Sequence, residues 1–387
     1  MPLPDVFEFQ VRTRIVFGQG LVKDVGFEAS KLKGTRAFIV SDKALRKLGL
    51  VQRVLDGFKD SGVEVAGIYD DVPPNSEVKV VEKGAKAARA AGCDLLVAVG
   101  GGSVMDTAKA INMLLVEGGS LLDWQGAGLL ARPLLPLIAI PTTAGTGSEV
   151  TIAAVIRDEA QGLKLEFNSP YMMPDVALLD PEMTRGLPAP ITAATGIDAL
   201  THAIEGYVSL YAEPVSDAQC LHAIRLAMRY LPRAVADGND IEARGYMLLA
   251  ATIAGIGFSN ALCGIVHAVA HACGGRFGVP HGVANGILLT HGMEFNLQQA
   301  AERYHDIAEA MGLAVQDESP EVATTMAILA VSHLRERIGL PCCLREVGVP
   351  RAGFAQLAED ALGDAMMISN PRAATQDEIV RLLENAY

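Results

Sequence analysis

Two patterns of apolar residues divide the chain into halves of different character. Up to about residue 185, short apolar runs alternate with amphipathic stretches, which predicts strands followed by helices. This alternation is typical of a doubly wound, mainly parallel sheet with helices on both faces. The predicted strands are residues 36–42, 63–70, 94–103 and 135–143, and predicted helices begin at Lys43 or cover 78–91 and 104–115.

After about residue 187 the strand-like runs end, and long stretches rich in Ala, Leu and Ile take over. They predict an all-helical second domain. The segment DPEMTRGLPAP (180–190), with three prolines, marks the boundary, so we expect an α/β domain over 1–185 and an all-helical domain over 186–387. The predicted helical stretches are 190–208, 214–235, 240–275, 281–311, 318–338 and 352–363.

Charge and cysteine usage exclude several classes of protein. The chain has 32 basic and 45 acidic residues and a net charge of −13, without a strongly basic run. Such a chain does not suit a nucleic-acid or anionic-membrane surface. The N-terminus lacks the apolar core of a signal peptide, and the six cysteines form no CxxC pair. We therefore expect a reduced, cytoplasmic protein.

One uncharged run needs a separate explanation. Residues 247–275 contain no Asp, Glu, Lys or Arg and are long enough to span a bilayer. The run nevertheless includes Thr252, Asn260, His267 and His271, and no basic cluster flanks it. We interpret it as the centre of a large helical core.

The ends of the predicted strands carry candidate nucleotide-binding residues. VAVGGGSVMDTAKA places three glycines between a buried strand and a helix, where backbone N–H groups and the helix dipole favour a phosphate. The motif is neither GxGxxG nor a Walker A loop, and a tight turn is the alternative. PTTAGTGSE (141–149) follows a second strand, although the two loops also read as unrelated polar turns.

Asp42 ends the first of these strands. A carboxylate at this position accepts hydrogen bonds from ribose hydroxyls and repels a 2′-phosphate, which favours NAD over NADP. Asp is equally a preferred N-cap for the helix that begins at Lys43, and the position alone does not separate the two interpretations.

Histidines and a carboxylate are spaced for a metal site in the helical half. His267 and His271 are four residues apart, as are Asp198 and His202, so each pair lies on one face of a helix. His281 follows a Gly-Pro break in GVPHGVAN, where a loop would aim it at the same point. A set of Asp198, His202, His267 and His281 suits Fe(II) or Zn(II).

Each of these residues also has a simpler explanation. A histidine on an apolar face is commonly a satisfied core residue, and Asp198 would cap a helix that starts after Gly196. A further alternative is that Cys263 or Cys273 takes the place of one histidine among the ligands. Four polar candidates in two apolar helices weaken these explanations, because every buried polar group needs a partner.

The sequence resembles the iron-containing, group III alcohol dehydrogenases across essentially its whole length. The resembling motifs stand in the expected order and at the expected separations, which makes them specific together. They are RIVFGQG (14–20), VGGGSVMDTAKA (99–110), IPTTAGTGSEVT (140–151), DPEMT (180–184), TGIDALTHAIEGYVS (195–209), GFSNALCGIVHAVAH (257–271) and VPHGVANGILL (279–289).

The resemblance implies a dehydroquinate synthase-like architecture, a divalent metal on Asp198, His202, His267 and His281, and dimers formed through the N-terminal domain. It implies that His271 lies near the nicotinamide and substrate without binding the metal. Where many relatives follow this histidine with Pro-Leu-Gly, the chain has Ala272-Cys273-Gly274, which predicts a thiol near the site. The implied cofactor contacts are Asp42, Asn75, Gly100, Gly101, Gly102, Ser103, Thr142, Thr143, Thr146 and Lys164.

The implied activity is hydride transfer between NAD, with NADP less favoured, and a small primary alcohol or diol. Glycerol dehydrogenase and maleylacetate reductase activities are close alternatives, and a dehydroquinate synthase-like lyase would share the fold. Arg276 is the only charged residue placed near the histidines by sequence, which favours a neutral substrate. A protein that binds nucleotide and metal without turnover is the alternative from another class.

Overall fold

The computed structural model describes residues 6–159 and 163–387, which divide into two compact units. The α/β unit comprises Val11–Thr143 and Gly147–Arg185. The helical unit comprises Gly186–Tyr387 together with Ala144–Thr146 and residues 6–10. The predicted domains 1–185 and 186–387 assign these last two segments to the other half of the chain, and the division into those domains stays a prediction.

Six parallel strands form the main sheet of the α/β unit, in the order β1-β9-β6-β4-β2-β3. The parallel, doubly wound sheet predicted from the apolar runs is therefore confirmed. The sequence analysis missed β1 and β9, which are only four residues long. The strands are β1 (Arg14–Phe17), β2 (Arg36–Val40), β3 (Glu64–Tyr69), β4 (Leu95–Gly100), β6 (Leu137–Pro141) and β9 (Val176–Leu179).

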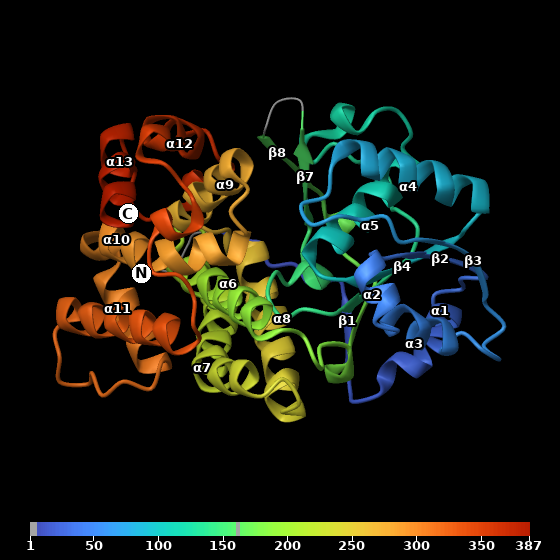
Figure 1. The fold of residues 1–387 in the computed structure, drawn as a ribbon, viewed down its shortest axis with the longest axis horizontal. Helices are drawn as coiled ribbons and strands as arrows, with labels where there is room; N and C mark the ends of the chain where they lie inside the picture. The colour runs from blue at the N-terminus through green and yellow to red at the C-terminus, as the bar shows by residue number, and fades with distance from the viewer. Residues whose placement is uncertain (1–5, 160–162) are drawn as a thin grey trace. The chain divides into compact units, whose positions relative to one another are not determined.

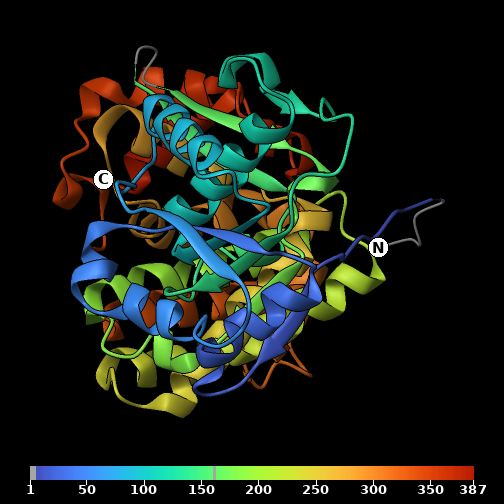
Figure 2. The ribbon, with the colours of Figure 1, turned by 90° about the vertical axis from the view of Figure 1, so that its right-hand side faces the viewer.

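Helices cover both faces of this sheet because successive strand residues point to opposite sides. In β4, Leu96 and Ala98 join the core formed with α4 and α5, whereas Leu95 and Val97 join the core formed with α1 and α3. Figures 1 and 2 show the two helix pairs on opposite sides of the strands. The helices are α1 (Val25–Lys31), α2 (Lys43–Lys47), α3 (Leu50–Asp56), α4 (Val78–Ala91) and α5 (Gly102–Val116).

A second, three-stranded sheet was not predicted. It has the order β5-β8-β7, and its longer strands, β7 (Ala153–Asp158) and β8 (Leu163–Asn168), are antiparallel, while β5 covers Gly126–Ala127. The side chain of Lys109 on α5 is completely buried beside this sheet. Its Nζ donates to the carbonyl oxygens of Thr151 and Ala153 at 3.0 and 2.8 Å, which ties α5 to β7.

The helical unit confirms the all-α prediction but corrects one helix. The apolar stretch 240–275 is two helices, because Leu262 adopts a left-handed φ of 63° and the chain restarts at Ile265. A final helix after residue 375 was also missed. The helices are α6 (Ala189–Val208), α7 (Pro214–Ala236), α8 (Ile241–Ala261), α9 (Ile265–Phe277), α10 (His281–Ala310), α11 (Pro320–Arg337), α12 (Phe354–Leu362) and α13 (Gln376–Asn385).

Within the described residues, only α8 has the length and apolar composition of a membrane span. Its most apolar window has a mean hydropathy of 1.2, and 61% of that window is buried inside the protein. Met247, Ala250 and Ala254 of α8 belong to the same buried cluster as side chains of α6 and α7. A core helix of a water-exposed unit meets the same criteria of length and composition as a membrane span, so α8 is weak evidence for a membrane.

Candidate functional site

Four side chains from three helices converge inside the helical unit. Asp198 and His202 lie on α6, His267 on α9, and His281 is the first residue of α10. One potential ligand atom from each of them lies within 4.8 Å of the others, and all but His281 are buried. His281 therefore reaches the cluster from a helix N-terminus and not from the loop that the sequence analysis expected.

Glu205 orients His267 within this cluster, and the sequence analysis missed it. The carboxylate lies 2.5 Å from Nδ1 of His267 and accepts the backbone N–H of Val266 at 2.8 Å. Burial acts to lower the pKa of His267, but the hydrogen bond and charge of Glu205 raise it on balance. A proton held on Nδ1 leaves Nε2 as the ligand atom, which is the carboxylate–histidine arrangement of metal sites.

Asn285 is a second side chain that the sequence analysis missed. Its Nδ2 donates to Asp198 Oδ1 at 2.6 Å and lies 3.2 Å from Nε2 of both His267 and His281. The amide thus contacts three of the four potential ligands. Asn285 follows His281 by four residues, and Glu205 follows Asp198 by seven, so helical spacing was the available signal for both.

The electrostatics of His202 fit a metal ligand. Burial, with the nearby charges of His267 and His271, lowers the pKa of His202 well below its ordinary value. The ring is therefore neutral near pH 7, as coordination requires. Its Nδ1 is buried without a hydrogen-bond partner. One carboxylate and three imidazoles, with an unmatched buried nitrogen among them, fit a divalent transition metal.

His271 lies beside the cluster but is not one of the four. Its Nδ1 is 2.8 Å from Oδ2 of Asp364, and its ring centroid is 5.2 Å from that of His281. The charge and hydrogen bond of His271 hold the pKa of Asp364 below its ordinary value despite burial. The arrangement is a histidine–carboxylate pair next to a cluster of potential ligands.

The cysteines near these histidines are buried, and burial raises the pKa of their thiols. Cys273 is completely buried in the helical core, and burial raises the pKa of its thiol to about 12. Burial of Cys273 thus disfavours the thiolate form, and the presence of a thiol near the site stays a prediction. Cys263 lies within 4.8 Å of ligand atoms of Glu205 and His267, and burial raises its pKa well above the ordinary value.

Gly282 keeps α10 close enough to α6 for His281 to join the cluster. A Cβ at this position would overlap the carbonyl oxygen of Ala194 on α6. Backbone cannot yield as a flexible side chain does, so any larger residue must push the start of α10 outward.

Gly282→Ala is expected to lower the retained metal at least roughly tenfold, because His281 moves away from the other three ligands. Metal content after desalting measures this loss. The matched control is Val283→Ala, which changes the neighbouring residue without adding a Cβ and should retain metal. Equal metal content in both variants would show that the close approach does not position His281.

Several candidate nucleotide-binding residues follow the carboxyl ends of strands in the main sheet. Strand order reverses between β2 and β4, since β3 lies on one side of β2 and β4, β6 and β9 on the other. Doubly wound sheets bind ligands beyond the carboxyl ends of their strands at such a point. Asp42 follows β2, and the glycine turn 100–103 ends β4.

The glycine turn is held by its neighbours. Ser103 Oγ accepts the backbone N–H of Asn75 at 3.1 Å, and Thr142 N donates to Gly100 O at 3.0 Å. A Cβ on Gly100 would lie 2.5 Å from Val104, and one on Gly101 would lie 2.9 Å from Thr143 Oγ1. Packing thus explains two of the three glycines. The first turn of α5, which begins at Gly102, has no side-chain cap, and this supports an anion there.

The other candidate cofactor residues lie on different elements of the chain. Asp42 caps α2, with Oδ1 accepting from Leu45 N at 2.8 Å. Lys164 lies on β8, and its charge acts on the half-buried Asp106 of α5. Thr146 belongs to the short segment that groups with the helical unit.

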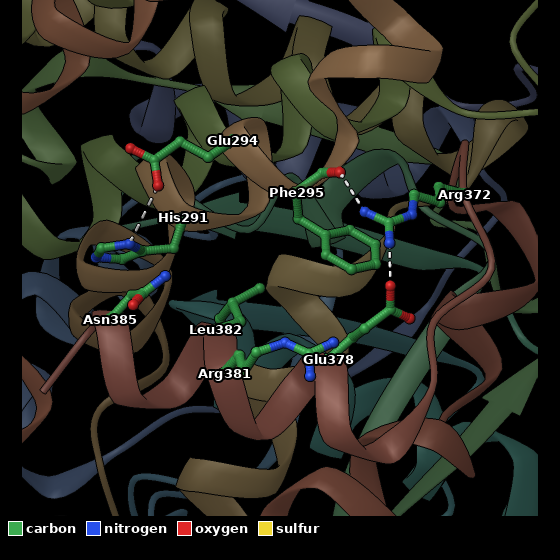
Figure 3. Close-up of a pocket in the computed structure, with 8 residues that line it drawn as sticks. All are labelled: His291, Glu294, Phe295, Arg372, Glu378, Arg381, Leu382 and Asn385. Carbon is green, nitrogen blue, oxygen red and sulfur yellow. Dashed lines mark hydrogen bonds and ion pairs between the residues drawn. The ribbon is translucent and has the colours of Figure 1, made fainter.

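One pocket of about 300 Å³ in the helical unit contains none of the candidate residues. It lies between α10 and α13. Figure 3 shows Arg372 between the carbonyl of Phe295 and the carboxylate of Glu378, with His291 beside Glu294 at the other end. We assign no chemistry to this pocket.

The fold and the four-ligand cluster together indicate the class of the protein. An α/β unit with a doubly wound sheet, joined to a helical unit that holds one carboxylate and three imidazoles, is typical of metal-dependent enzymes that use a nucleotide. Residues 12–181 match the family model for iron-containing alcohol dehydrogenase, and residues 192–387 match that for the C-terminal part of the Fe-containing alcohol dehydrogenase family. The chain belongs to the iron-containing alcohol dehydrogenase family.

Individual relatives agree over the whole length. The chain is 41% identical over 384 residues to the 1,3-propanediol dehydrogenase of Citrobacter freundii, covering 99% of both chains. It is 40% identical over 371 residues to the NAD-dependent methanol dehydrogenase of Bacillus methanolicus, covering 96% of this chain and 97% of the other. A solved 1,3-propanediol oxidoreductase superposes with a TM-score of 0.96 at 42% identity, covering 99% of this chain and all of that one.

Family membership settles the class of reaction. The chain is an alcohol dehydrogenase, an oxidoreductase that uses NAD and a metal, and iron is the metal of the family. The resemblance that the sequence motifs indicated is therefore confirmed.

Proposed function

We propose that the protein interconverts a small, neutral primary alcohol or diol and its aldehyde at a metal held by Asp198, His202, His267 and His281. The observation that carries the proposal is the convergence of these four side chains within 4.8 Å. The donor set suits Fe(II), with Zn(II) as the alternative. A metal bound there would supply Lewis-acid chemistry, which lowers the pKa of an alcohol oxygen.

The side chains around the ligands prepare the site. Glu205 fixes the tautomer of His267, and Asn285 holds the carboxylate of Asp198 by a hydrogen bond of 2.6 Å. Such second-layer contacts orient ligands before the metal arrives, which strengthens binding.

A neutral substrate is supported by the charges near the histidines. Arg276, on the same helix as His267 and His271, forms a two-point ion pair with Asp360, with Nη2 2.8 Å from Oδ1. A dianionic substrate such as that of a maleylacetate reductase needs an uncompensated cation, and Arg276 already has its partner. The names of the relatives, which specify methanol and 1,3-propanediol, point to the same class of substrate.

His271 is our candidate for moving the alcohol proton out of the site. Its ring stands beside that of His281, and Asp364 holds it through Nδ1. His271→Ala is expected to lower kcat roughly a hundredfold and to flatten one limb of the pH–rate profile, while the metal content stays unchanged. Loss of metal from this variant would instead make His271 a ligand, contrary to the proposal.

Asp42 is proposed to select NAD over NADP, and the cap that it forms allows a clean test. Asp42→Asn keeps an oxygen to cap α2 but removes the charge, so it should shift the ratio of kcat/KM for the two cofactors toward NADP by roughly tenfold. Asp42→Ala should give the same shift and also lose about 1 kcal/mol of stability, because the cap is lost. An unchanged cofactor ratio in both variants would limit Asp42 to capping.

The proposed cofactor contacts are Asn75, the turn from Gly100 to Ser103, Thr142, Thr143, Thr146 and Lys164, in addition to Asp42. The support is the reversal of strand order between β2 and β4 and the uncapped start of α5.

We further propose a cytoplasmic homodimer that uses the β1 edge of the main sheet. The support is an edge strand with half-exposed Ile15 and Phe17. Phe27 of α1, in the same unit, is 60% exposed. Unpaired sheet edges with apolar side chains favour pairing with a second chain. The six cysteines are all free thiols, which suits a reducing compartment.

The decisive experiment follows NADH formation with a panel of short alcohols and diols. Metal-stripped protein is compared with portions reloaded with Fe(II) without oxygen or with Zn(II). We expect activity to vanish on stripping and to return with one of the metals. Protein that binds NAD but stays inactive on every alcohol and aldehyde under both loadings would favour a lyase or a non-catalytic binding protein.

A further inference from the structure

A pair of adjacent cysteines lies outside the catalytic machinery. Cys342 and Cys343 follow Pro341 in the connection between α11 and α12, and the sequence alone suggests no more than packing. Cys342 is exposed, whereas Cys343 is buried and precedes a short 3-10 helix, Leu344–Val347. This segment shares no residue with the four-ligand cluster.

The two thiols converge on one carboxylate oxygen. Cys342 Sγ donates to Oε1 of Glu346 at 3.0 Å, and Cys343 Sγ donates to the same atom at 3.2 Å. Adjacent residues of an extended chain point to opposite sides, so the bend before the 3-10 helix is what brings these thiols together. One ligand atom of each of the three residues lies within 4.8 Å of the other two.

The segment is also fixed to its surroundings. The backbone N–H of Cys342 donates to Oε2 of Glu346 at 3.3 Å, and Leu344 N donates to Ala386 O at 2.8 Å. The three donors are therefore arranged before any ligand binds, which reduces the ordering that binding requires.

We propose that Cys342, Cys343 and Glu346 form a second metal site, which takes a thiophilic divalent cation such as Zn²⁺ or Cd²⁺. Two thiolates and a carboxylate supply three of the four ligands of a tetrahedral site, and water supplies the fourth. Binding breaks two S–H bonds and forms two metal–sulfur bonds, and both protons pass to solvent. The four-ligand cluster contains no sulfur, so the two sites differ in the cations that they prefer.

The test titrates Cd²⁺ into the iron-loaded enzyme without oxygen and follows the ultraviolet charge-transfer absorption of cadmium thiolates. We expect saturation at about one Cd²⁺ per chain and no such absorption in Cys342→Ser/Cys343→Ser. The matched control is Cys93→Ser, which removes a half-exposed thiol from the α/β unit and should leave the absorption intact. Iron-dependent activity should be unchanged in all of these variants.

Two results would overturn the proposal. One is wild-type enzyme without cadmium–thiolate absorption at saturation, and the other is equal absorption in the double variant. If the double variant does not fold, Cys342→Ser replaces it, because that side chain is exposed and its loss should weaken Cd²⁺ binding at least roughly tenfold. Full binding by folded Cys342→Ser would also contradict the proposal.

Discussion

His267→Ala is expected to remove the metal and to lower kcat/KM by on the order of a thousandfold or more, about 4 kcal/mol of transition-state stabilisation. The reason is geometric, because Glu205 Oε2 lies 2.5 Å from Nδ1 of His267 and so directs the Nε2 atom of that ring toward the metal. Metal content after desalting and the rate of NADH formation measure the two effects. His222→Ala, at an exposed histidine on α7, is the matched control and should retain both.

Substitution of Glu205, which contacts His267, is expected to weaken metal binding without abolishing it. Glu205→Gln keeps the volume and a hydrogen-bonding group but removes the charge, so metal affinity should fall roughly ten- to a hundredfold and excess metal should restore activity. If His267→Ala kept a full complement of metal, the proposed ligand set would be wrong.

The second large effect concerns stability, at the buried Lys109 of the α/β unit. Lys109→Met should lower the free energy of unfolding by about 3–5 kcal/mol, because the carbonyl groups of Thr151 and Ala153 lose their donor and the half-buried Asp106 loses its compensating charge. Urea unfolding followed by the fluorescence of Trp124, the only tryptophan, reports on this unit. The exposed Lys86→Met is the control, and an equal effect in both variants would contradict this account.

The same lysine has a signature in the pH dependence of stability. Burial lowers the pKa of Lys109 from 10.5 to about 8, so in this window the unfolded chain binds more protons than the folded one. The contribution of Lys109 to stability therefore rises between about pH 8 and 10.5. The difference in unfolding free energy between wild type and Lys109→Met should grow over that range.

The sequence predicted elements well where periodicity decides structure. Helix α4 begins at Val78 and ends at Ala91, as its amphipathic pattern indicated. Strand β1 was missed because it is a four-residue edge strand, and its apolar run of Ile15, Val16 and Phe17 is shorter than the runs that predict the other strands. The sequence pattern did not predict the break between α8 and α9. The break depends on the positive φ of Leu262, and leucine normally continues a helix.

The residues of the candidate site also divide into those that helical spacing predicts and those that depend on tertiary structure. Helical spacing could pair Asp198 with His202 and His267 with His271, because residues four apart share a face. His281 was proposed from the Gly-Pro break before it, and the exclusion of His271 from the ligands came from the resemblance. The role of Glu205 depends on the start of α9, where its carboxylate accepts the N–H groups of Val266 and His267. No pattern in the sequence locates that helix start, since the restart after Leu262 is itself invisible to periodicity.

All four donors belong to the helical unit, whereas the glycine turn at Gly100 belongs to the α/β unit. The proposed metal ligands and most of the proposed nucleotide contacts thus belong to separate units, with Thr146 as an exception. In a cell short of iron, newly made protein should still take up NAD while remaining inactive. The amount of protein recovered on an NAD-affinity resin would then exceed the amount of active enzyme. The metal-to-protein ratio would report the active fraction.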